Sequence, residues 1–134
     1  MEAMAHPTHQ DATMIIQLAQ LSAAAGVRDA TAWLRRDQSL ADYATFVQNN
    51  PLGSEGDRHL RTVAGHYELI GTLYKYGLVH EDLLFDWLAI APLWDQMKAL
   101  VIGDRDRAGI PQLGENFEAL AKAQLAWADR RKAV

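Results

Sequence analysis

The chain has 134 residues, of which 49% are hydrophobic and 22% are charged, and it contains no cysteine. One hydrophobic core suffices for a chain of this size, and the lack of cysteine excludes disulfides, thiolate nucleophiles, iron–sulfur clusters and cysteine-based zinc sites. The net charge is −4, from 13 basic and 17 acidic residues, and no apolar run approaches the roughly 20 residues of a membrane-spanning helix. We therefore expect a cytoplasmic protein that binds neither nucleic acid nor membrane.

The first helix is expected to start near Asp11. Residues 1–10 contain Pro7 and no apolar repeat, which predicts a flexible amino terminus ahead of one helical domain over residues 11–134. From Met14 to Ala25, apolar residues recur every three or four positions, and Gly26 follows as a stop.

Residues 29–50 carry a second helical pattern, with Asp29 as a possible capping residue. Ser39 and Asp42 stand at the spacing of a second capping pair, so the pattern allows either one helix or two with a break near Asp37. The sequence does not decide between these alternatives.

A long central helix is predicted after the turn at 51–54, because Ser54 followed by Asp57 resembles a capping box. Apolar residues surround much of this helix, which Gly77 is expected to end. Gly65 and Gly71 each cost about 1 kcal/mol relative to alanine inside a helix, so we expect close helix crossings at both.

Three further helices are expected, around 83–88, 93–101 and 117–127, with Pro92 near the start of one. A charged turn from Asp104 to Arg107, bracketed by Gly103 and Gly109, is expected between the last two. No segment alternates with the period of a strand, so the sequence predicts an all-α fold, a single compact bundle of five to seven helices.

One stretch of the chain resembles a known family. It comprises His66 to Gly71, Tyr76 to Val79, Leu93 with Trp94, and Phe117 to Leu120, and the similarity extends over about 66–127. It resembles a family of small all-helical bacterial proteins described only as a domain of unknown function. Members often carry a membrane-spanning helix ahead of this domain, which this sequence lacks, so membrane association is not carried over. The resemblance implies a fold and no activity.

Glu68 is the most interesting candidate for chemistry, because it follows Leu60 and Ala64 at four-residue steps in the oiliest helix. A carboxylate in such a place needs a partner. An ion pair or cap with an arginine such as Arg35, Arg36 or Arg61 is one interpretation. The alternative is a small-molecule-binding or hydrolytic bundle that uses Glu68 with His66 or Trp94.

Other catalytic and metal motifs are incomplete. The three serines, Ser22, Ser39 and Ser54, lie outside any nucleophile elbow. His80 and Glu81 begin a zinc-protease pattern, but Leu84 stands where the second histidine is required. His59 and His66 lie seven residues apart without an inward pair of carboxylates, so we expect no metal or other cofactor and assign no catalytic residue.

Four tryptophans, at 33, 87, 94 and 127, are expected in the core because they stand among leucines at helical spacing. A DNA-binding helix-turn-helix over residues 78–102 is disfavoured, because this segment has one basic residue, Lys98, and four acidic residues that would repel phosphates: Glu81, Asp82, Asp86 and Asp95.

Residues 104–115 partly match the spacing of a calcium-binding EF-hand loop. Asp104, Asp106, Gly109 and Glu115 stand at the first, third, sixth and twelfth places of an EF-hand loop. The fifth place is Ala108, and two arginines add positive charge. We therefore expect no calcium binding at submillimolar concentration, and a charged turn in which Pro111 starts the next helix.

The leading functional hypothesis is an interaction or regulatory module without an assembled catalytic site. Apolar residues on nearly every side of the central helix, with four tryptophans in a small domain, favour a homodimer.

Overall fold

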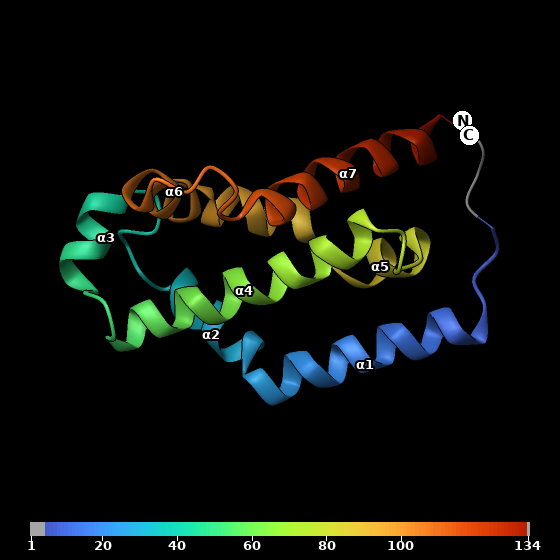
Figure 1. Ribbon diagram of the computed structural model, residues 1–134, viewed down its shortest axis with the longest axis horizontal. Helices are drawn as coiled ribbons and strands as arrows, with labels where there is room; N and C mark the ends of the chain where they lie inside the picture. Colours follow the sequence, from blue (N-terminus) through green and yellow to red (C-terminus); the bar gives the residue numbers. More distant parts are fainter. Residues whose placement is uncertain (1–4, 134) are drawn as a thin grey trace.

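The computed structural model describes residues 5–133, and this part of the chain forms seven α-helices and no strand (Figure 1). Within it, no helix combines the length and apolar character needed to cross a membrane. The predicted all-α bundle of five to seven helices is confirmed. The helices are α1 (His9–Ala25), α2 (Val27–Arg35), α3 (Tyr43–Asn49), α4 (Glu55–Lys75), α5 (Glu81–Trp87), α6 (Ile90–Ala108) and α7 (Glu115–Lys132).

Helix α4 is the central element, as its oily circumference predicted. In Figure 1 it runs between α7 and α6 on one side and α1 and α2 on the other, and its main partners are α7 and α2. Helices α6 and α7 also pack on each other. The core between these layers includes Leu34, Phe46, Val63, Ile70, Leu84, Ile90, Met97, Leu100, Phe117 and Leu120.

Helix α1 begins at His9, two residues before the predicted start, because Thr8 and Asp11 form a capping box. The Thr8 backbone N–H donates to the Asp11 carboxylate at 2.9 Å, and the Asp11 N–H donates to the Thr8 hydroxyl at 3.1 Å. Gly26 ends the helix with a φ of 71°, as predicted. Residues 1–4 lie outside the described residues, and flexibility over residues 1–10 stays a prediction.

The segment 29–50 contains two helices, α2 and α3, separated by residues 36–42. Asp29 lies in the first turn of α2 and does not cap it. The capping residue of α3 is Asp42, whose side chain accepts from the Thr45 backbone N–H. Ser39 instead donates its backbone N–H to Asp37 at 2.8 Å, which closes the turn where the break was considered.

Helix α4 begins after Ser54, whose hydroxyl accepts from the Asp57 N–H, and Gly77 follows its end with a φ of 73°. One of the two predicted close crossings is present. A Cβ at Gly71 would lie 2.3 Å from the carbonyl oxygen of Asn116 in α7, whereas a Cβ at Gly65 would meet nothing within 4 Å. The expectation for Gly65 was therefore wrong.

The expected charged turn at 104–107 is also wrong, since these residues form the last turns of α6. Gly103 lies inside the helix, where its lack of a side chain makes room for the Tyr43 ring; a Cβ there would lie 2.2 Å from ring carbon Cγ. Helix α6 ends at Gly109, which has a φ of 66°. Pro111 lies in the turn at 110–114 and does not start α7, which begins at Glu115.

Candidate functional site

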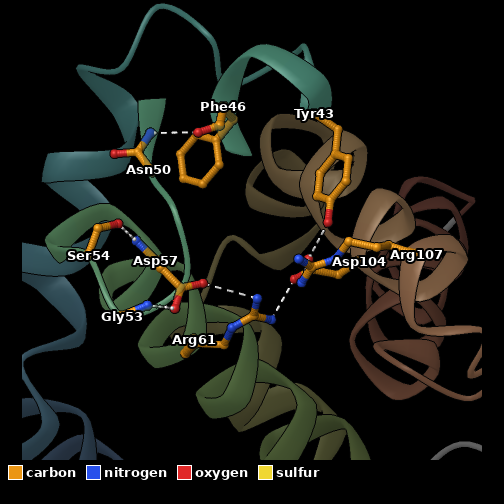
Figure 2. Close-up of polar contacts among 9 residues, drawn as sticks. All are labelled: Tyr43, Phe46, Asn50, Gly53, Ser54, Asp57, Arg61, Asp104 and Arg107. Carbon is orange, nitrogen blue, oxygen red and sulfur yellow. Dashed lines mark hydrogen bonds and ion pairs between the residues drawn. The ribbon is translucent and has the colours of Figure 1, made fainter. Parts of the chain in front are cut away.

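The most concentrated set of polar contacts surrounds the buried carboxylate of Asp104 in α6 (Figure 2). Its Oδ1 accepts from the Tyr43 hydroxyl at 2.7 Å, and its Oδ2 accepts from Arg61 Nη1 at 2.5 Å. Arg107 approaches Oδ1 at 3.4 Å, and Arg61 also reaches Asp57 at 3.1 Å. The carboxylate thus joins α3, α4 and α6 at one end of the bundle.

Burial and charge act against each other in this network. Burial disfavours the charged form of Arg61, but the Asp104 and Asp57 carboxylates outweigh it and raise the Arg61 pKa. Burial also raises the pKa of Tyr43, and its hydrogen bond to Asp104 adds to this. Two carboxylates and two guanidinium groups balance one another, so the network carries no free charge for a ligand.

The cavity beside the network is too small for a substrate. It is lined by residues of α3, α4 and α6, including Phe46, Asn50 and Leu60, and has a volume of about 10 Å³. Such a volume accommodates about one water molecule. The network therefore holds three helices together and offers no room for a reacting molecule.

The EF-hand spacing does not correspond to an EF-hand loop. Residues 104–108 are helical, and the Asp104 oxygens accept hydrogen bonds from Tyr43, Arg61 and Arg107. A calcium loop needs its alternate oxygens to converge on one point, which a helix does not permit. Over residues 5–133, no group of three or more histidine, aspartate or glutamate side chains is arranged to hold a metal ion.

Glu68 caps α7, and its partners are backbone N–H groups rather than one of the arginines that were considered. Its Oε1 accepts from the backbone N–H groups of Asn116 and Phe117, both at 3.0 Å, in the first turn of α7. The N-cap residue of α7 is Gly114, which has no side chain to do this. A carboxylate at this point also complements the positive end of the helix dipole.

His66 and Trp94 belong to a set of packed rings that includes Phe117, the residue whose backbone N–H donates to Glu68. His66 contacts Tyr67 edge to face, Tyr67 stacks on Phe117, and Trp94 meets Phe117 edge to face, with centroid separations of 5.1 to 5.3 Å. Burial lowers the pKa of His66, which favours the neutral imidazole. His66 and Trp94 are thus part of an aromatic core, whereas the Glu68 carboxylate caps α7.

The remaining histidines and tryptophans also separate. His59 packs against Trp33 at 5.1 Å and lies 3.5 Å from Glu55, away from His66 in the core. Trp94 is buried, and Trp33 and Trp127 pack against the core as expected. Trp87 is 36% exposed, so the core prediction was wrong for this residue.

Two polar residues matter that sequence reasoning did not assign. The Gln124 Oε1 of α7 accepts from the N–H groups of Ile90 and Ala91, both at 2.7 Å, and its Nε2 donates to the Leu88 carbonyl at 2.6 Å. His80 caps α5 by accepting from the Asp82 N–H at 3.2 Å. For Gln124, the sequence held one signal: α6 begins after Ala89, which has no side chain that could cap the helix.

Comparison with known proteins identifies a family but no characterised relative. Neither a search of curated proteins nor a search of solved structures found a match. The family model of a domain of unknown function, DUF4760, matches residues 7–127. This confirms the resemblance noted over 66–127 and extends it to the helices that precede Glu68. Because the match spans most of the chain, this protein belongs to the DUF4760 family.

Proposed function

We propose that this chain is a helical interaction module that works without an assembled catalytic site and forms a homodimer in the cytoplasm. Its polar side chains support this interpretation. Asp104 is enclosed by two arginines and a tyrosine, while Glu68 and Gln124 each satisfy the backbone at a helix start. Groups engaged in this way stabilise the fold and are not free for catalysis.

The observation that carries the proposal is the outer face of α1. No charged residue occurs from Ala12 to Ala25, and Leu18 is the one side chain of α1 that is fully buried. Ile16, on the same stripe as Ala19 and Ala23, is 57% exposed, and Leu21, about 140° further around the helix, is 43% exposed. A neutral helix face with exposed aliphatic side chains is typical of a surface that another protein covers.

The partner we propose is a second copy of the chain. Beside α1 lies a shallow groove lined by Ala19, Ala23, Gly26 and the partly exposed Trp87, together with Ser22, Arg28 and Asp29. Small residues allow a helix to approach closely, and tryptophan is a frequent anchor at interfaces. Two α1 helices, each about 25 Å long, can pair around a two-fold axis, and Arg28 and Asp29 beside the groove contribute one charge of each sign, which balance.

Light scattering at high micromolar concentration tests this proposal. We expect a dimer mass for the wild-type protein and a monomer mass for Ile16→Glu, because the two-fold axis brings the two new carboxylates close together. Leu125→Glu is the matched control, since Leu125 is 58% exposed and lies on α7. This variant should keep the dimer mass.

A monomer mass for the wild-type protein would refute the dimer, and dissociation by Leu125→Glu alone would place the interface elsewhere. The rival function, a small-molecule-binding or hydrolytic bundle, has its own readout. A metabolite or metal that raises the melting temperature by several degrees, with loss of that rise in Glu68→Gln, would favour the rival.

A further inference from the structure

An open groove between α4 and α7 lies apart from the Asp104 network and from the outer face of α1. It has a volume of about 340 Å³, which is within the range of about 300 to 1,000 Å³ of pockets that hold small molecules. Its surface is mostly apolar and includes Gly71, Tyr74, Ala119 and Leu120. The Tyr74 hydroxyl already donates to Glu81 at 2.6 Å, so the part of Tyr74 that remains for a ligand is its ring.

Two charges of opposite sign stand on the two helices that form this groove. Lys75 lies in the last turn of α4, and Glu115 is the first residue of α7. Both side chains are exposed, and in the part of the chain that the structure describes neither forms an ion pair. The Lys75 ammonium instead lies 5.7 Å from the centre of the Tyr76 ring. Each charge is therefore available to a ligand of opposite charge.

The packing of the two helices keeps these charges apart. The helices cross closely at Gly71, where a Cβ would lie 2.3 Å from the carbonyl oxygen of Asn116. Figure 1 shows that α4 and α7 run in the same direction along the bundle. Lys75 lies one helical turn after the crossing, about 6 Å along α4, whereas Glu115 comes just before it on α7. The two charges thus lie towards opposite ends of the groove, with apolar surface between them.

The backbone at the start of α7 does not supply a binding group. The N–H groups of Asn116 and Phe117 already donate to the Glu68 carboxylate, both at 3.0 Å. A ligand carboxylate therefore has its partner in the Lys75 ammonium and not in the helix start. A ligand ammonium has its partner in the Glu115 carboxylate.

We propose that this groove binds a small zwitterion whose ammonium and carboxylate are separated by an apolar chain, that is, an ω-amino acid. Its ammonium pairs with Glu115, its carboxylate pairs with Lys75, and the methylene groups between them cover the apolar surface around Ala119. An α-amino acid fits less well, because both of its charges sit on one carbon atom and do not reach both side chains. The groove is separate from the α1 face, so this binding does not depend on the proposed dimer.

A titration of the full chain, followed by amide shifts in nuclear magnetic resonance, tests the proposal. We expect ε-aminocaproate to shift the amides of Gly71, Lys75 and Ala119 in a saturable way. Norleucine is an isomer with both charges on one carbon atom, while caproate and hexylamine each lack one charge. All three should bind at least about threefold more weakly, because each loses one exposed ion pair. Equal affinity for ε-aminocaproate and any of these three compounds, or no shift in the groove, would overturn the proposal.

Charge variants assign the two ends of the ligand. Lys75→Gln should abolish the preference for ε-aminocaproate over hexylamine, and Glu115→Gln should abolish the preference over caproate. Lys98→Gln is the matched control for loss of a positive charge, since Lys98 lies on α6 in a pair with Asp95, and it should keep both preferences. A preference that persists in its groove variant would refute that ion pair, and if a variant fails to fold, the series of ligands on the wild-type protein decides.

Discussion

Replacement of Glu68 by alanine should destabilise the protein by about 2 kcal/mol. The carboxylate accepts two backbone N–H groups of α7 at 3.0 Å each, in a half-buried position. Loss of an N-cap costs about 0.5 to 2 kcal/mol, and a hydrogen bond to a charged group contributes about 1.5 to 3 kcal/mol. The two N–H groups partly regain water in the variant, which places the expected loss near the middle of these ranges.

Urea unfolding measures this loss as a shift in the transition midpoint at constant slope. Glu68→Gln keeps an acceptor oxygen but removes the charge, so it should lose about half as much as Glu68→Ala. Leu69→Ala is the control for a change in the same turn, since Leu69 is 41% exposed. A Glu68→Ala midpoint within error of the wild type would refute the view that this carboxylate holds the start of α7.

Two further variants test other contacts. Gln124→Ala should cost about 2 to 3 kcal/mol in urea unfolding, because it leaves the buried Ile90 N–H without an acceptor; a loss below about 0.5 kcal/mol would contradict this. Burial, together with the hydrogen bond to Glu81, raises the Tyr74 pKa above its ordinary value of about 10. The neutral phenol therefore stabilises the fold fully below about pH 10, and this stabilisation decreases as the pH rises above that value. Tyr74→Phe should therefore lose stability less steeply than the wild type above about pH 10, and equal slopes in urea unfolding across this range would contradict the assignment.

The helices could be predicted because each has a local signal. Gly26 and Gly77 end α1 and α4 in the left-handed conformation, and Ser54 caps α4, as the sequence indicated. The break between α2 and α3 was left open because Asp37 and Asp42 act through local hydrogen bonds that either alternative allowed. These features depend on residues a few positions apart, which is the range over which sequence patterns are informative.

The errors have a different origin. Gly103 was expected to bracket a turn, but it lies inside α6, where the Tyr43 ring from another helix occupies the space that a side chain would need. Gly65 was expected at a helix crossing that does not occur, whereas Gly71 meets Asn116 as expected. In each case the role of a glycine depends on a distant neighbour, which local spacing does not contain.

The same distance explains why the candidate site could be located but not interpreted from the sequence. Glu68 stood out as a carboxylate in an oily helix, and its role became clear only with the start of α7, 48 residues away, beside it. Gln124 acts in the same way on α6, whose N-cap residue Ala89 offers no side-chain acceptor. Helices α6 and α7 each begin without a capping side chain of their own, and each receives one from another helix of the bundle. A polar residue in an apolar helix, together with a helix start that lacks a cap, therefore favours a structural role over a catalytic one in this fold.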